Sequence, residues 1–219
     1  LEAVAAALEA RQGEILAANA ADMEAARAAG MRPSLQDRLA LDAGRIAGIV
    51  EGVRQVKALP DPIGTVTKMY TRPNGLTIGK RRVPLGVIGI IYEARPNVTV
   101  DAAALCLKSG NPVILRGGKE AFRSNQAFVS AMRDALEEAG LPRDCVALVA
   151  DTSRESAREL MGLTEYLDVL IPRGGAGLIR SVVENARVPV IETGVGVCHV
   201  YVHEGADLDM AARIIHNAK

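Results

Sequence analysis

The sequence has few aromatic residues and no net charge. Aromatic residues make up 3% of the 219 residues, Trp is absent, and 26 Lys and Arg balance 26 Asp and Glu. A neutral chain with few rings for base stacking is a poor match for nucleic acid, so we expect no nucleic-acid partner. Since 49% of the residues are hydrophobic, aliphatic side chains and alanine must pack a sizeable core.

Long apolar runs are also missing. No run approaches the roughly 18 residues of a membrane-spanning helix, so we expect no membrane partner. The three cysteines, Cys106, Cys145 and Cys198, are too far apart for a metal motif. An odd count without close pairs is typical of a reducing compartment. We therefore predict a cytoplasmic protein without a metal site, whose cysteines are small buried hydrophobes.

Two helices are predicted in the N-terminal part of the chain. Apolar residues recur at helical spacing over 1–29, and Gly30 marks the end of this helix. A second helix is predicted over 34–59, where Ser34 with Asp37 three residues later resembles a capping box.

The period of the pattern changes after this helix. Residues 65–71 and 76–83 alternate polar with apolar, and the Arg-Pro-Asn-Gly sequence at 72–75 is a turn sequence. We predict a projecting β-hairpin over 64–83. Because its edges are unpaired, a partner subunit is expected to cover it, so we predict a homo-oligomer formed through the hairpin.

Strands and helices alternate from residue 84 onward. The predicted strands are 86–92, 112–116, 145–150, 167–172 and 188–192. The predicted helices are 98–109, 124–139, 153–162, 176–186 and 207–218. Repeated βα units with short connections predict an α/β fold with an open, parallel, Rossmann-like sheet and helices on both of its faces. In such a sheet, ligands bind in the crevice at the carboxyl ends of the strands.

One candidate phosphate site begins at Arg173. Gly174 and Gly175 follow it between a strand and a helix, where backbone N–H groups and the helix dipole favour an anion. A tight strand-to-helix turn explains the glycines equally well. The second candidate is Arg116-Gly117-Gly118-Lys119, in which two cations flank an open backbone. Two cations at an adenosine-ribose position suit a 2′-phosphate, hence NADPH, although a solvated loop with surface charges is the alternative.

Asn97 follows a proline at a strand end. Its amide could donate to an oxyanion, or the residue could cap the next helix. Cys198 and His199 do not form a nucleophile–base pair in our interpretation, because 197–202 reads as a strand and neighbours on a strand point to opposite faces.

The sequence resembles one family closely. Tyr-Glu-Ala-Arg-Pro-Asn-Val at 92–98 and Ile-Leu-Arg-Gly-Gly-Lys-Glu at 114–120 are similar to signatures of the gamma-glutamyl phosphate reductases, within the aldehyde dehydrogenase superfamily. Residues 171–174, 190–196 and 214–219 carry the same resemblance, which runs the length of the chain.

The resemblance implies an NADPH-dependent enzyme of proline biosynthesis. In that reaction a cysteine thiolate attacks the acyl phosphate of L-glutamate 5-phosphate and expels phosphate. Hydride from NADPH then reduces the thioester, which yields L-glutamate 5-semialdehyde. No metal takes part, and functional coupling to glutamate 5-kinase is a further expectation.

Site residues carry over from the resemblance by position. Asn97 matches the oxyanion-hole asparagine, and Arg116 and Lys119 match the adenosine-ribose site. Gly174 and Gly175 lie where the superfamily covers the pyrophosphate and the nicotinamide. Glu192 matches a glutamate that activates water in hydrolytic relatives; in a reductase we expect it to be structural or to orient the ligand. Glu93 and Arg95, beside Asn97, are candidates for the amino and carboxylate ends of the glutamyl substrate or its phosphate, with a surface ion pair as the alternative.

The nucleophile is the departure from the family pattern. None of the three cysteines matches it, because in the reductases it follows the Asn-Ala-Lys of 217–219. We predict that this polypeptide is the cofactor-binding part of the enzyme and is inactive alone. Residues 1–63 and 84–195 form the NADPH-binding domain, 64–83 the oligomerisation hairpin, and 196–219 the start of the catalytic domain.

Two other functions remain open from the sequence. A hydrolytic, NAD-using aldehyde dehydrogenase would use Glu192 as base and favour an acidic residue at 119, which Lys119 argues against. A non-catalytic nucleotide-binding module could end at Lys219, but the helix predicted over 207–218 has no stop signal such as Gly or Pro.

Overall fold

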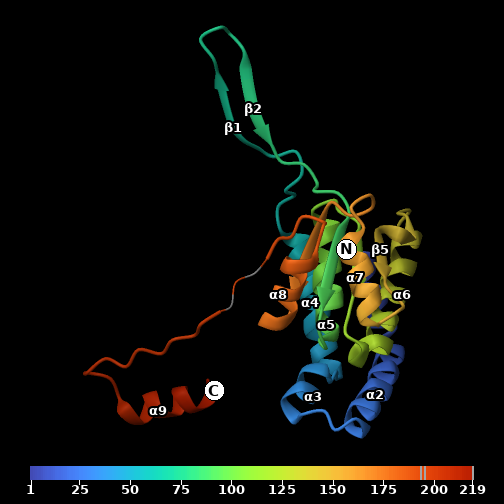
Figure 1. Ribbon diagram of the computed structural model, residues 1–219, viewed down its shortest axis with the longest axis vertical. Coiled ribbons are helices and arrows are strands. Elements are labelled where there is room, and N and C mark those ends of the chain that lie inside the picture. The colour runs from blue at the N-terminus through green and yellow to red at the C-terminus, as the bar shows by residue number, and fades with distance from the viewer. Residues whose placement is uncertain (193, 195, 219) are drawn as a thin grey trace.

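The centre of the molecule is a parallel sheet of four strands. The computed structural model describes residues 1–192, 194 and 196–218 (Figure 1). The strand order is β5-β4-β3-β6, and all three pairings are parallel. The strands are β3 (Ile88–Tyr92), β4 (Val113–Arg116), β5 (Val146–Leu148) and β6 (Val169–Arg173). The predicted open parallel sheet is therefore confirmed.

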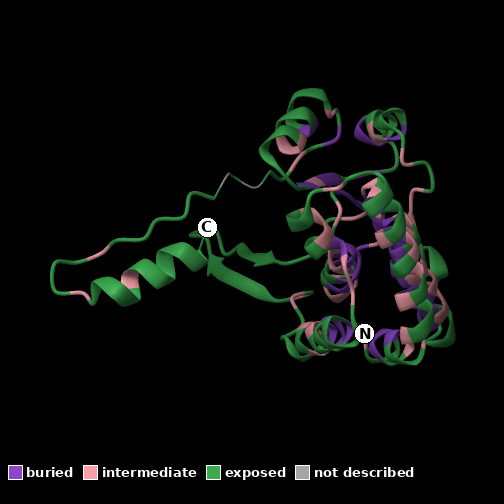
Figure 2. Ribbon diagram, turned by 90° about the horizontal axis from the view of Figure 1, so that it is seen from below, coloured by how far each residue is buried: buried purple, intermediate pink, exposed green. Residues whose placement is uncertain are grey.

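Helices cover both faces of this sheet, and each face has its own core (Figure 2). Alternate residues of β3 point to opposite sides: Ile88 and Ile90 join the larger core, whereas Ile91 joins the smaller. The larger core packs against α5 (Pro96–Lys108) and α6 (Phe122–Glu138), and the smaller against α7 (Arg154–Gly162) and α8 (Ala176–Asn185). Burial on both faces explains why the central strands are continuously apolar.

Four helices, rather than the predicted two, precede the hairpin. The first predicted helix is divided into α1 (Glu2–Ala10) and α2 (Gln12–Ala28). Arg11 lies at the break, and its guanidinium donates to Asp134 Oδ2 (2.7 Å) and Ser130 Oγ (3.3 Å) on α6. The break therefore coincides with a tertiary contact that helical periodicity does not reveal.

The second predicted helix is also divided, into α3 (Pro33–Leu39) and α4 (Ala43–Ala58). The predicted Ser34 cap is wrong, because the N-cap of α3 is Arg32 and makes no side-chain hydrogen bond. Asp42 caps α4 instead, accepting from Arg45 N (2.7 Å). Buried Asn19 satisfies the interrupted backbone: it donates to Leu39 O (2.9 Å) and accepts from Leu41 N (2.8 Å).

The predicted hairpin is confirmed as β1 (Val66–Thr71) and β2 (Thr77–Arg81), which pair antiparallel. It projects from the body (Figure 1), and every residue of both strands is exposed. Exposed apolar side chains on it include Met69 and Ile78. The hairpin is therefore a surface that the rest of this chain does not cover.

The C-terminal part contains less strand than predicted. Residues 188–192 contribute only a parallel bridge between Val190 and Leu170, and 197–202 form no strand. Helix α9 (Leu208–Asn217) follows, capped by Asp207, and lies apart from the sheet (Figure 1). Without strand neighbours, Cys198 is exposed, so its predicted burial is wrong; Cys106 is buried as predicted. Two short 3-10 helices, Lys119–Ala121 and Arg143–Cys145, complete the elements.

Candidate functional site

The carboxyl ends of the central strands lie at one edge of the sheet. In the parallel register, Tyr92 pairs with Arg173, and Ile91 pairs with both Pro172 and Arg116. The loops after β3, β4 and β6 therefore begin side by side, and the predicted site residues other than Glu192 lie in these loops, at the ends of the three strands or at the start of the helix that follows. This is the edge at which open α/β sheets bind ligands.

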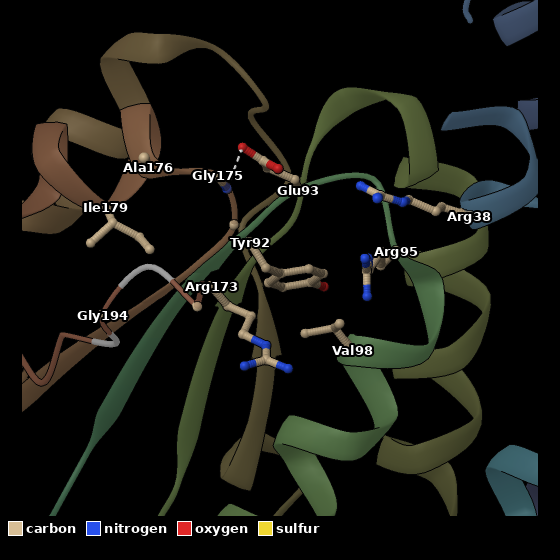
Figure 3. Close-up of a pocket in the computed structure, with 12 residues that line it drawn as sticks. Arg38, Tyr92, Glu93, Arg95, Val98, Arg173, Gly175, Ala176, Ile179 and Gly194 are labelled. Atoms are coloured by element: carbon tan, nitrogen blue, oxygen red, sulfur yellow. Dashed lines mark hydrogen bonds between the residues drawn. The ribbon is translucent and has the colours of Figure 1, made fainter. Parts of the chain in front are cut away.

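A cavity of about 420 Å³ lies at this edge (Figure 3). It contains five of the predicted site residues: Glu93, Arg95, Arg173, Gly174 and Gly175. The other lining residues are Arg38, Tyr92, Val98, Ala176, Ile179, Gly194 and Gly196. Three arginines face one glutamate, so the charge of the lining favours an anionic ligand.

Glu93 connects β3 to the first turn of α8. Its Oε1 accepts a hydrogen bond from Gly175 N at 3.2 Å (Figure 3). A Cβ at position 174 would lie 2.8 Å from Glu93 Cδ and 2.9 Å from Leu178 Cδ2, which explains the glycine there. The N-terminus of α8 thus already holds a carboxylate oxygen, as its N–H groups and dipole favour.

Arg116 and Lys119 lie at the same edge but do not line this cavity. The Arg116 guanidinium donates to Thr152 O and Ser153 O, both at 2.7 Å, and so faces the loop after β5. Burial lowers the pKa of Arg116, against the opposing charges of Asp151 and Glu120. Its Nε is buried and has no hydrogen-bond partner within the described chain. Lys119 is exposed.

Gly117 and Gly118 are close-packed rather than merely flexible. A Cβ at 117 would collide with the Asn125 amide and approach the Tyr92 hydroxyl to 3.1 Å. A Cβ at 118 would lie 2.7 Å from a Glu120 oxygen and 3.4 Å from Ala94 N, next to the end of β3. The two glycines therefore let the loop after β4 approach the loop after β3.

A buried polar network lies beneath these glycines, and sequence reasoning missed it. The Tyr92 hydroxyl lies 2.7 Å from Thr99 Oγ1, which donates to Asn125 Oδ1 at 2.8 Å. All three residues are buried. Burial raises the pKa of Tyr92, although its bond to Thr99 opposes the shift. The network ties β3, α5 and α6 together directly behind the first cavity.

Asn97 does not cap α5, because that helix begins at Pro96 with Arg95 as its N-cap. The capping interpretation is therefore wrong. Asn97 Nδ2 donates instead to Asp101 Oδ2, one turn later, at 3.1 Å. Partial burial raises the pKa of Asp101, and the bond from Asn97 and the charge of Arg173 oppose this shift. Since an amide carries two N–H groups, the second Asn97 donor can serve a ligand.

Asn97 and Asp101 line a second cavity of about 450 Å³. Arg38, on α3, and Arg95 line both cavities, which therefore meet at these two side chains. Arg38 is a site residue that the sequence analysis missed. An arginine on a short amphipathic helix is normally a surface residue, so no sequence signal distinguishes it.

Glu192 is exposed and does not line either cavity, although the nearby Gly194 and Gly196 line the first. Among the described residues, none of the three cysteines lines either of these two cavities. Burial in α5 raises the pKa of Cys106 to about 11, so its thiol is protonated at neutral pH.

Within the described residues, no group of three or more His, Cys, Asp and Glu side chains could hold a metal ion. In the same part of the chain, no helix is both long and apolar enough to cross a membrane.

Comparison with known proteins agrees with this architecture. The model of the aldehyde dehydrogenase family matches residues 1–219, so the chain belongs to that family. Its sequence is similar to gamma-glutamyl phosphate reductases: 64% identical to that of Heliobacterium modesticaldum and 63% to that of Moorella thermoacetica, each over the whole chain and 52% of the relative. The resemblance found in the sequence is thus confirmed.

Solved structures give the same result. The gamma-glutamyl phosphate reductase of Thermotoga maritima matches with a TM-score of 0.89 at 50% identity, over 99% of this chain and 52% of the other. The enzyme of Saccharomyces cerevisiae matches at 0.80 and 33% identity, over 99% of this chain and 55% of the other. An acetylating aldehyde dehydrogenase from Geobacillus thermoglucosidasius, 19% identical, shares the fold with a TM-score of 0.69. The chain spans about half the length of the curated relatives it matches.

Proposed function

We propose that this chain is the cofactor-binding part of a gamma-glutamyl phosphate reductase, which reduces L-glutamate 5-phosphate with NADPH to L-glutamate 5-semialdehyde and phosphate. The observation that carries the proposal is the cationic cavity at the carboxyl edge of a parallel sheet, in a chain 64% identical to a reductase of that name. Both the acyl phosphate and the cofactor are anionic, as this edge requires.

The residues present fit a phosphorylated nicotinamide cofactor. At the N-cap of α8, the Gly175 N–H already donates to a Glu93 carboxylate oxygen, so the same N–H can donate to a pyrophosphate oxygen once the exposed Glu93 side chain turns away. The unpartnered buried Nε of Arg116 and the exposed Lys119 are the donors we assign to the adenosine ribose and its 2′-phosphate. When bound, NADPH supplies the hydride.

The chain's own residues prepare the acyl group for reaction. We assign Asn97 to the oxyanion: Asp101 fixes one of its N–H groups and orients the amide, and the second points a dipole at developing negative charge. Gly174 leaves room for the Glu93 side chain beside the loop between β6 and α8, so Glu93 can occupy Gly175 N until the cofactor replaces it. Glu192 keeps a structural or ligand-orienting role in this proposal, since an activated water would hydrolyse the thioester.

The nucleophilic thiol is assigned to a segment outside these 219 residues. Cys106 is buried with a raised pKa, and neither Cys145 nor Cys198 lines either of the two cavities at the carboxyl edge. The chain alone is therefore expected to lack activity. The proposed domains are 1–63 with 84–195 for the cofactor, 64–83 for oligomerisation, and 196–219 as the start of the catalytic domain.

Assembly, location and pathway are further parts of the proposal. The exposed apolar side chains of the hairpin support a homo-oligomer, which deletion of 64–83 would dissociate in sedimentation analysis. We also propose a cytoplasmic location, and we propose coupling to glutamate 5-kinase because the acyl phosphate must be supplied by a kinase.

The reaction is tested with the full-length protein that carries this chain. It is assayed in the oxidising direction with L-glutamate 5-semialdehyde, inorganic phosphate and NADP+, following NADPH formation. We expect turnover that requires phosphate, and none from the 219-residue chain. Turnover that proceeds equally without phosphate would identify a hydrolytic aldehyde dehydrogenase and refute the proposal.

A further inference from the structure

The second cavity has the charge pattern of an amino-acid site. It lies between α3, α4 and α5, and its lining carries both cationic and anionic side chains. The lining residues are Asp37, Arg38, Ala40, Leu41, Arg45, Gly48, Ile49, Arg95, Asn97 and Asp101. A volume of about 450 Å³ is within the range of small-molecule sites. A ligand in this cavity would contact both cationic and anionic side chains, and also the apolar residues Leu41 and Ile49.

Some of these charges are already neutralised within the protein. Arg45 binds Asp37 Oδ1 at 2.7 Å and Ala40 O at 2.8 Å, and it also donates to Asp37 O. Arg45 and Asp37 therefore close the end of α3 and contribute little charge to a ligand.

Arg38 and Arg95, unlike Arg45, keep their charges available to a ligand. Within the described chain, neither guanidinium makes a hydrogen bond or an ion pair with another side chain, although ten ion pairs are formed elsewhere. They come from α3 and from the loop after β3, and both line each of the two cavities; Figure 3 draws them in the first. Two like charges beside one cavity repel each other, and an anion between them removes that repulsion.

Asp101 is the matching anionic group. Its carboxylate accepts a hydrogen bond from Asn97, and it forms no ion pair in the described part of the chain. It is thus open to a cation on the cavity side. An α-amino acid presents a carboxylate and an ammonium on one carbon, so a pair of arginines and an aspartate in one cavity can bind both groups together.

We infer that this cavity binds the amino-acid end of the substrate: Arg38 and Arg95 hold its α-carboxylate, and Asp101 receives its α-ammonium. The inference rests on the proposed function and adds Arg38 and Asp101, as specificity-determining residues, to Arg95. The acyl end then lies near Asn97, which lines the same cavity and holds Asp101. The α-carboxylate and the acyl carbon are the two ends of the five-carbon glutamyl chain, a span that fits within one such cavity.

The test uses the full-length enzyme in the oxidising direction, because there the three anionic sources are separate substrates: the semialdehyde carries the α-carboxylate, inorganic phosphate the phosphoryl group, and NADP+ the 2′-phosphate. For Arg38→Ala we expect the KM for the semialdehyde to rise at least about tenfold, the effect of losing one charge-assisted bond. In the same variant, the KM values for phosphate and for NADP+ should stay within about twofold of the wild-type values. Arg38→Lys recovers part of the loss.

A matched control is Arg32→Ala, an exposed arginine at the start of the same helix that lines neither cavity. It should leave all three KM values unchanged. Far-UV circular dichroism and thermal unfolding of each variant confirm that the fold is intact.

Asp101 is tested with the des-amino substrate, glutarate semialdehyde, which lacks the ammonium group. Wild type should have a higher kcat/KM for the amino-acid substrate than for glutarate semialdehyde, and Asp101→Asn should reduce this ratio about tenfold. Arg38→Ala should instead lower kcat/KM for both substrates by a similar factor. A rise confined to the KM for phosphate or for NADP+ in Arg38→Ala would overturn the inference. So would an unchanged preference in Asp101→Asn. If the wild-type enzyme shows no phosphate-dependent turnover, the proposed function itself is wrong. If the wild-type enzyme is active and the variants behave like it, only the inference about this cavity is wrong.

Discussion

Replacing Asn19 with alanine should destabilise the fold by about 3 kcal/mol. The side chain is 2% exposed and makes three hydrogen bonds: to Leu39 O (2.9 Å), to Ser124 Oγ (3.1 Å) and from Leu41 N (2.8 Å). Each bond contributes about 1 kcal/mol net, and the backbone groups left behind at the break between α3 and α4 lose their partners. The break separates α3, which carries Arg38, from α4.

The assay is equilibrium urea unfolding followed by far-UV circular dichroism. With a slope of about 2–3 kcal/mol per molar urea, the midpoint should fall by about 1 M. Asn185→Ala is the control, because Asn185 makes a single exposed bond, to Ser181 O, and its loss should cost less than about 0.5 kcal/mol. If Asn19→Ala also changed the free energy of unfolding by less than about 0.5 kcal/mol, the proposed role of Asn19 at the helix break would be wrong.

Three further predictions concern single residues. At about pH 8 a thiol reagent should modify exposed Cys198 and spare Cys106 until the protein unfolds, because burial raises the Cys106 pKa to about 11; equal labelling rates would contradict this. Gly177→Ala should stabilise α8 by about 0.5–1 kcal/mol in urea unfolding, since a Cβ there meets no atom within 4 Å; destabilisation would reveal an unrecognised contact. Because the pKa of Asp101 is raised, its carboxyl group binds a proton more tightly in the native state than in the unfolded state, and the free energy of unfolding should fall as pH rises through that pKa. Asp101→Asn should remove this pH dependence. Identical profiles of unfolding free energy against pH for variant and wild type would refute the prediction.

The sheet was predictable because its signals are local. Repeated βα units predicted a parallel sheet, and uncharged runs such as 88–92 that end in loops of charge and glycine indicated the edge that carries the site; the strand order came only from the structure. The hairpin followed from period-two alternation around a turn sequence.

The breaks in the N-terminal helices were not predictable, because distant residues cause them. Arg11 contacts α6, and Asn19 binds the backbone of 39–41; neither contact leaves a periodic signal. Asp42 was a recognisable cap residue that could have indicated the second break.

The site residues divide in the same way. Motif reasoning found Arg95, Arg173 and Gly174, which lie at or shortly after the carboxyl ends of strands. It missed Arg38 because its place in the cavity depends on how α3 packs, which follows from the break rather than from the helix's own sequence. It also interpreted Gly117 as open backbone, whereas the buried Asn125 and Tyr92 leave no room for a side chain there.

The central claim is that the carboxyl edge of the sheet recognises a phosphorylated nicotinamide cofactor, and cofactor preference tests it most directly. The ratio of kcat/KM for NADPH to that for NADH is measured for the full-length enzyme and for Lys119→Glu. Arg187→Glu provides the same charge reversal next to Val188, at the opposite edge of the sheet. We expect Lys119→Glu to lower the ratio about tenfold or more, since a carboxylate would repel the 2′-phosphate, and Arg187→Glu to leave it unchanged. A ratio that is the same in Lys119→Glu as in wild type would contradict the account.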